Sequence, residues 1–216
     1  MGMACAICRT RKPRRFCPGV NADICTLCCG AEREVTVDCP LDCPYLQEAR
    51  KHEHTEPPNP DEIPNKDIHV TEEFLAEHED LLVGAMRGLM RASFDTPGAV
   101  DRDVRDALDA LVRTQRTLQS GVYYESRPVN ALADRIFGAT QTGLEEFRTS
   151  EKEKFGMSRT RDTDVLVVLV FLQRLELDRN NGRPRGRAFL DSLRGWLGEV
   201  EGDIPETPQA SPLILP

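Results

Sequence analysis

The sequence predicts a mainly α-helical protein in which a small cysteine-rich domain precedes a helical bundle. All eight cysteines lie between Cys5 and Cys43, and none occurs in the rest of the chain. Residues 55–68 contain four prolines and few apolar side chains. From about residue 69 to residue 201, apolar residues recur at three- and four-residue steps, as one face of an α-helix requires. The chain therefore divides into a cysteine-rich domain (1–54), a stiff linker (55–68), a bundle (69–201) and a loose tail (202–216).

Five helices are predicted in the bundle, beginning near residues 71, 99, 128, 163 and 186. Three of these starts have a proline near the first turn, where its missing N–H costs nothing: Pro97, Pro128 and Pro184. Residues 165–172, VLVVLVFL, are ambiguous because their β-branched content also suits a buried strand. We predict a buried helix there, since Asp162 and Thr163 are candidate caps and the neighbouring segments are helical.

The cysteines fall into two sets by spacing. Cys5 and Cys8 form one C-x2-C pair, Cys25 and Cys28 form another, and sixteen residues separate the pairs. This spacing is typical of a tetrahedral zinc site, because each tight turn presents two thiolates on one side of the chain. The remaining thiols are the right number for a second, interleaved site: Cys17, Cys29, Cys39 and Cys43.

A metal is also expected on energetic grounds. A segment of under sixty residues with few large apolar side chains cannot stabilise itself by burial alone. Each structural zinc can contribute on the order of 10 kcal/mol to folding. Pro44 follows Cys43 and predicts a short helix with Cys43 at its N-cap, where the helix dipole favours a thiolate. The sequence therefore predicts Zn²⁺ bound by the cysteines, with two ions as the expected number.

The interleaved pairs resemble the binuclear cross-brace and treble-clef zinc fingers of the HIT, MYND and B-box kind. Residues 15–18, RFCP, are similar to the aromatic-x-Cys-Pro step of HIT fingers but lack their second cysteine two residues on. Residues 25–46 also resemble bacterial proteins of unknown activity that carry a zinc-finger head on a helical body. The resemblance implies metal binding; the adjacent Cys28 and Cys29, and the absence of a final histidine in register, depart from the named fingers.

Other interpretations of the cysteines stay open. They are disulfides, an iron–sulfur cluster, or one zinc with four spare thiols. His52 and His54 are candidate replacement ligands, although a His pair beside a linker is more often solvated. His78 falls on an apolar helix face, which favours a core histidine over a ligand.

Two basic segments are candidate contacts for phosphate or nucleic acid. The first crowds the loop before Phe16, which has the ring needed to stack on a base, and contains Arg9, Arg11, Lys12, Arg14 and Arg15. The alternative interpretation is that these residues only balance charge, because a four-thiolate zinc site carries a net charge of about −2 that guanidinium groups offset. The second, residues 179–187, is predicted to be a solvated interhelical loop.

No catalytic signature is present, and four-cysteine zinc sites are closed and structural. The net charge of −8 argues against general adhesion to DNA or anionic lipid. No secretory leader and no membrane-length apolar run are visible, which favours a cytoplasmic protein. We therefore expect a non-enzymatic interaction or adaptor protein with a protein partner and no membrane. The alternative is an RNA- or DNA-binding regulator that uses the loop at residues 9–15. The oligomeric state stays open.

Overall fold

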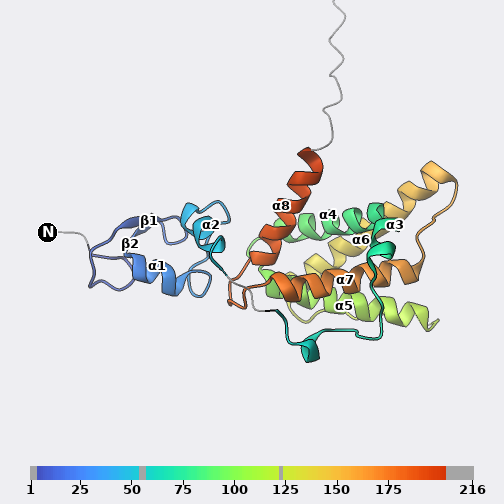
Figure 1. The fold of residues 1–216 in the computed structure, drawn as a ribbon, viewed down its shortest axis with the longest axis horizontal. Coiled ribbons are helices and arrows are strands. Elements are labelled where there is room, and N and C mark those ends of the chain that lie inside the picture. The colour runs from blue at the N-terminus through green and yellow to red at the C-terminus, as the bar shows by residue number, and fades with distance from the viewer. Residues whose placement is uncertain (1–3, 54–56, 122–123, 203–216) are drawn as a thin grey trace, which may run out of the picture.

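A computed structural model describes residues 4–53, 57–121 and 124–202, without the side chains of residues 199–202. We call residues 4–53 the head and residues 57–202 the body. Figure 1 shows the head beside one end of the body. The tail predicted for residues 202–216 lies outside the described residues, apart from Gly202.

The head contains a β-hairpin and two short helices. Strands β1 (Arg15–Cys17) and β2 (Ala22–Ile24) pair antiparallel. Helix α1 spans Thr26–Glu32 and helix α2 spans Pro44–Arg50. The hairpin turn packs closely on the chain between the helices, because a Cβ at Gly19 would lie 2.5 Å from the Asp38 carbonyl oxygen. The buried core of the head consists of cysteines and a few aliphatic residues: Ile24, Val37, Leu41 and Leu46.

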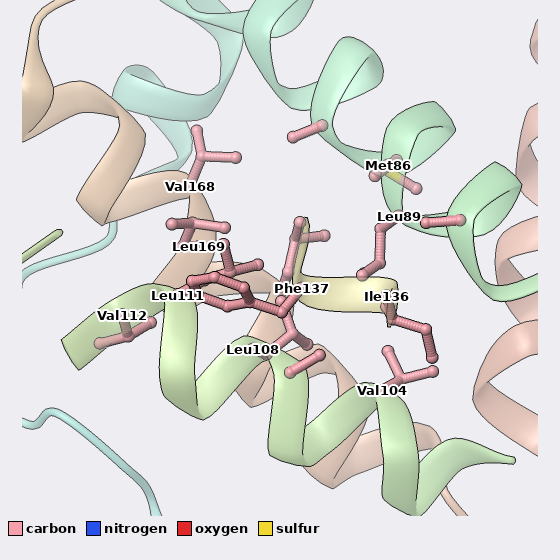
Figure 2. Close-up of a cluster of buried hydrophobic side chains, with 14 of the residues drawn as sticks. Met86, Leu89, Val104, Leu108, Leu111, Val112, Ile136, Phe137, Val168 and Leu169 are labelled. Atoms are coloured by element: carbon pink, nitrogen blue, oxygen red, sulfur yellow. The ribbon is translucent and has the colours of Figure 1, made fainter. Parts of the chain in front are cut away.

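The body is helical, as predicted. After the 3₁₀ turn η1 (Pro60–Glu62) it comprises α3 (Glu72–Glu77), α4 (Glu79–Phe94), α5 (Asp101–Gln119), α6 (Ala131–Phe155), α7 (Asp162–Arg179) and α8 (Ala188–Gly202). Helices α4 and α5 both pack against α6, and α7 packs against α4, α5 and α8. Phe137 and Ile136 of α6 are fully buried in the middle of this core (Figure 2).

The ambiguous segment at residues 165–172 is helical, as preferred, and lies within α7. Its apolar side chains surround the helix because α7 is enclosed by several neighbours, and such a helix shows no one-sided apolar stripe. That burial explains why residue pattern alone did not separate helix from strand.

The predicted first helix is instead two helices, α3 and α4, which meet at His78. The His78 backbone leaves the α-helical region, with φ −112° and ψ 30°. Its ring stacks on Phe74 at 4.1 Å between centroids, and its Nδ1 lies 3.0 Å from the Phe74 carbonyl oxygen. The prediction of a core histidine with its hydrogen bonds satisfied is close to this arrangement, although the ring is partly exposed.

The proline-rich segment contacts the body. The Asn65 side chain donates to Gln173 Oε1 (2.6 Å) and accepts from the Arg116 guanidinium. The Arg174 guanidinium donates to the carbonyl oxygens of Asn65 and Ile68. These bonds attach the end of the predicted linker to α5 and α7, which its composition did not predict.

Candidate metal centre

The first cysteine set is assembled as the spacing predicts. The sulfurs of Cys5, Cys8, Cys25 and Cys28 all lie within 4.8 Å of one another. Among the described residues, they are the one group of Cys, His, Asp or Glu side chains brought together so closely. We call these four residues the first quartet. They are positioned to bind a metal ion, and all eight cysteines of the chain are free thiols.

Backbone structure places the first quartet. Cys5 and Cys8 lie on a turn that is closed by a hydrogen bond from the Arg9 N–H to the Cys5 carbonyl (2.8 Å). Cys25 is the N-cap of α1, and Cys28 follows in the first turn of that helix. Hydrogen bonds from Ala6 N–H to Asp23 O (3.0 Å) and from Cys5 N–H to Arg11 O (2.8 Å) fasten the turn to the hairpin.

The surroundings of the first quartet favour anionic sulfur. The Cys25 N–H donates to Cys5 Sγ (3.2 Å) and the Cys28 N–H donates to Cys25 Sγ (3.4 Å). Both bonds lie at the N-terminus of α1, where the helix dipole favours negative charge. The Arg11 guanidinium lies 3.7 Å from Cys25 Sγ, and this hydrogen bond raises the pKa of Arg11.

The thiols of this quartet differ in acidity. Hydrogen bonds from the Thr10 side chain and backbone lower the pKa of Cys8 to about 5. The backbone N–H of Cys28 lowers the pKa of Cys25. Burial raises the pKa of Cys28 to about 12. Because a dication favours the thiolate form of every ligand, its binding would release the proton that Cys28 otherwise retains.

The second cysteine set lines part of one small cavity, and the structure does not bring its sulfurs together as closely as those of the first quartet. Cys17 ends β1, Cys29 lies in α1, and Cys43 is the N-cap of α2. Together with Cys39, they line a cavity of about 10 Å³. We call these four residues the second quartet. Its cavity is about large enough for one water-sized particle, and apolar contacts from Ile24, Val37 and Leu46 help to close it.

Two residues of the first basic segment, Arg11 and Arg15, contact cysteine sulfurs. Arg15 Nη1 lies 3.6 Å from Cys29 Sγ, and the same guanidinium lies 4.1 Å above the Tyr45 ring. Arg11 is exposed but contacts the first quartet through Cys25, and the other three basic residues are exposed as well: Arg9, Lys12 and Arg14. This is the arrangement that the electrostatic interpretation expects. Arg33, which sequence reasoning did not select, lies 3.9 Å from Cys29 Sγ. Its position four residues after Cys29 on α1 was the available signal.

The second basic segment is the loop between α7 and α8, as predicted, but only part of it is solvated. Arg185 is exposed, whereas the side chains of Arg183 and Arg187 are 29% and 16% exposed, respectively, and both contact the head. Arg183 donates to the Arg33 carbonyl oxygen (2.7 Å), and Arg187 pairs with Asp38 (2.9 Å). These contacts were not predicted because charge composition does not reveal a surface that a distant segment covers.

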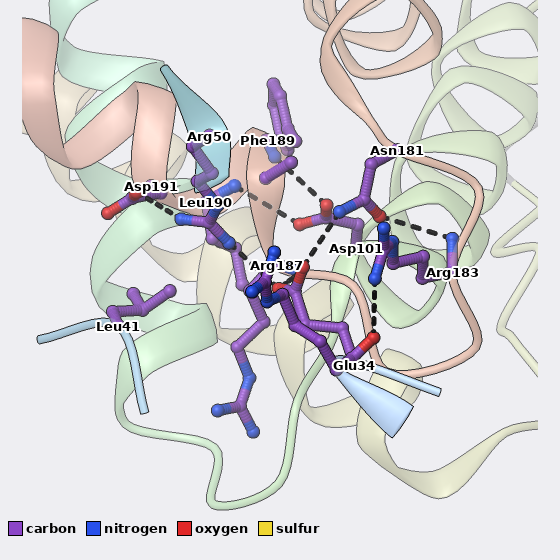
Figure 3. A network of polar contacts seen from close by, with 12 residues as sticks. Glu34, Leu41, Arg50, Asp101, Asn181, Arg183, Arg187, Phe189, Leu190 and Asp191 are labelled. Atoms are coloured by element: carbon purple, nitrogen blue, oxygen red, sulfur yellow. Dashed lines mark hydrogen bonds and ion pairs between the residues drawn. The ribbon is translucent and has the colours of Figure 1, made fainter. Parts of the chain in front are cut away.

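A buried carboxylate stands at this contact between head and body. Glu34 is 0% exposed and has a φ of 53°. Its carboxylate accepts from Arg50 (2.9 Å), the Asn181 amide (2.8 Å) and the Arg187 N–H (3.1 Å). Its carbonyl oxygen accepts from the Arg185 N–H (2.8 Å). Arg50 also pairs with Asp191 of α8. Figure 3 shows Arg50 between the two carboxylates. We call these contacts of Glu34 and Arg50 the joint.

Histidines take no visible part in either quartet. His52 is exposed, and its Nε2 lies 3.4 Å from Glu48 Oε1. His54 lies outside the described residues. No helix in the described part of the chain is both long and apolar enough to cross a bilayer.

The chain matches no protein-family model, no curated protein and no solved structure.

Proposed function

We propose that this chain is a non-enzymatic, cytoplasmic interaction protein whose head is held by two structural Zn²⁺ ions, one in each quartet. The observation that carries the proposal is the convergence of four cysteine sulfurs within 4.8 Å. Four thiolates complete a tetrahedral zinc shell and leave no position for water or substrate. Such a centre stabilises a surface and supplies no catalyst. Free thiols at all eight positions support a reducing compartment.

The surface offered to a protein partner lies on the head. Phe16 of β1 is 53% exposed, and Leu27 of α1, located between two ligands of the first quartet, is 63% exposed. Aromatic side chains such as Phe are enriched at protein interfaces, and a large exposed apolar side chain such as Leu gains stability when a partner covers it. Both residues are placed by elements that carry cysteines, so a partner that binds them depends on the metal.

The test is a pull-down with purified chain, using quantitative mass spectrometry and matched variants. Phe16→Ala and Leu27→Ala are expected to lose a partner that the native chain retains, and chelation is expected to lose it as well. Met157→Ala is the control, because Met157 is 67% exposed on the body. If every protein recovered with the native chain is also recovered with both head variants and after chelation, the interaction surface is not on the head.

Nucleic-acid binding is the second candidate, and one observation favours it. Arg9, Lys12 and Arg14 stay exposed on the strand and loop that carry the exposed Phe16 ring. Cationic side chains beside a ring suit a single strand. Titration with mixed oligonucleotides at two salt concentrations tests this, with the triple Ala variant of these residues as comparison. Salt-sensitive binding that the triple variant loses supports this function, and binding that is absent or unaffected removes it.

A further inference from the structure

The head holds the body through one continuous segment, residues 33–53. This segment supplies the Arg33 carbonyl, the Glu34 carboxylate and Asp38 to the loop between α7 and α8. It also supplies Gln47 and Arg50, which both contact Asp191 of α8. Three further contacts join Glu34 with Asn181, the Glu34 carbonyl oxygen with the Arg185 N–H, and Glu53 with Arg183.

The same segment is built around the second quartet. Cys39 and Cys43 lie within it, and Cys29 precedes it by one helical turn. Burial raises the pKa of Cys39, and the nearby backbone N–H of Glu34 opposes that rise, so Glu34 lies beside a quartet residue while its carboxylate contacts the body. Arg50 is the last residue of α2, which begins directly after Cys43. Arg33 likewise donates to Cys29 Sγ and offers its carbonyl to Arg183.

Besides the second quartet, this segment is fixed by local backbone hydrogen bonds to the Glu32 carbonyl oxygen and by three buried aliphatic side chains, Val37, Leu41 and Leu46. Helices α1 and α2 have seven residues each, which is too short for a helix to be stable on its own. Glu34 sits in the left-handed region, which is unfavourable for a residue with a Cβ. A fully buried carboxylate that loses its hydrogen-bonding partners also costs free energy, so a partly open joint is unfavourable.

We propose that metal in the second quartet closes the joint, so that loading of this site and docking of the head on the body are coupled. The proposal rests on the proposed function, because it requires the second quartet to bind metal. Glu34 is the coupling residue: the metal fixes Cys39, which lies five residues after Glu34, and the fixed chain aims the Glu34 carboxylate at Arg50, Asn181 and Arg187. The first quartet binds residues 5–28, none of which makes a hydrogen bond to the body in the described part of the chain.

The first experiment removes metal from the native chain and follows the joint. A chelator is added in steps, newly freed thiols are alkylated, and peptide mass analysis shows which quartet has been emptied. Hydrogen exchange is measured in parallel at the Arg185 and Arg187 amides, which donate to Glu34. We expect both amides to lose protection as the second quartet empties, while amides of α5 stay protected. Continued protection after the second quartet is empty would overturn the coupling.

The second experiment uses the reciprocity of linked equilibria. Glu34→Gln keeps the size of the side chain but removes the charge that Arg50 pairs with. We expect this variant to bind the second-quartet metal about tenfold more weakly in competition with a chelator, within the usual range of coupling between sites. Glu48→Gln is the matched control, because Glu48 is exposed on α2 and contacts Lys51 and His52.

These outcomes separate the two proposals. Native affinity of Glu34→Gln for the second-quartet metal would overturn the coupling and leave the proposed function intact. A native chain that binds no metal in either quartet would remove the proposed function itself, before the joint is considered.

Discussion

For Arg11, the effect of the contact with sulfur can be tested separately from the effect of the positive charge. Its guanidinium lies 3.7 Å from Cys25 Sγ, whereas Arg14 is exposed a few residues away. Groups that hydrogen-bond a metal ligand typically change metal affinity by about 10- to 100-fold. We expect Arg11→Ala to weaken metal binding in the first quartet by about tenfold, measured by competition with a chelator. Arg14→Ala is the control, and equal affinities for the two variants would show that Arg11 acts only through its charge.

Asp101 gives the body a pH dependence. Its carboxylate accepts from the N–H groups of Phe189 and Leu190 at the start of α8, and burial raises its pKa to about 7. The unfolded value is about 3.9. The native state therefore binds more protons between these values, so the stability contributed by Asp101 is lost as the pH rises from about 4 to about 7.

The prediction for Asp101→Asn follows from that sign. This variant cannot titrate, so its unfolding free energy should lack a decline of up to about 4 kcal/mol over that pH range. Denaturant unfolding at about pH 5 and about pH 8 measures the difference. Asp80→Asn, at an exposed position on α4, is the control. Parallel curves for the native chain and Asp101→Asn would show that Asp101 has an ordinary pKa.

At the scale of elements, α6 connects α4 and α5 across the core of the body. Phe137 of α6 is 0% exposed, whereas Phe155 of the same helix is 50% exposed. Removing a buried Phe side chain typically costs about 3–5 kcal/mol through lost burial and the cavity that remains. We expect a loss of this size for Phe137→Ala by denaturant unfolding, and a much smaller loss for Phe155→Ala. Similar losses would show that Phe137 is not packed as the structure has it.

Most elements of the body were predictable because each carries its own signal. Five of the six described body helices begin at residues 72, 101, 131, 162 and 188, within three residues of the starts read from periodicity and capping. The break at His78 was not predictable, because Phe74 and His78 lie four residues apart on one face whether or not the helix continues. What interrupts the helix is a contact between a ring and a carbonyl oxygen, which spacing does not encode.

The candidate metal site was predictable only in part. The first quartet follows from two C-x2-C pairs, because that motif closes a turn by itself. Cys17, Cys29, Cys39 and Cys43 line one cavity but are not brought as close together as the first quartet, so the second site stays a prediction. Glu34 could not be found, because its burial depends on Asn181 and Arg187, about 150 residues further along the chain.

At the scale of the whole molecule, we propose that metal–sulfur bonds stabilise the head in place of a large apolar core. The head buries four large aliphatic side chains besides its cysteines, namely Ile24, Val37, Leu41 and Leu46. A segment of this size normally needs metal, disulfides or a partner to fold. Its contacts with the body are polar and centre on Glu34, so they position the head without replacing its core.

The most direct test of this claim is native mass spectrometry of the reduced chain combined with hydrogen exchange of the head. The account predicts a mass that includes two zinc ions, and protected Cys25 and Cys28 amides that exchange rapidly once both ions are chelated. A metal-free mass with both amides still protected, under reducing conditions, would contradict it.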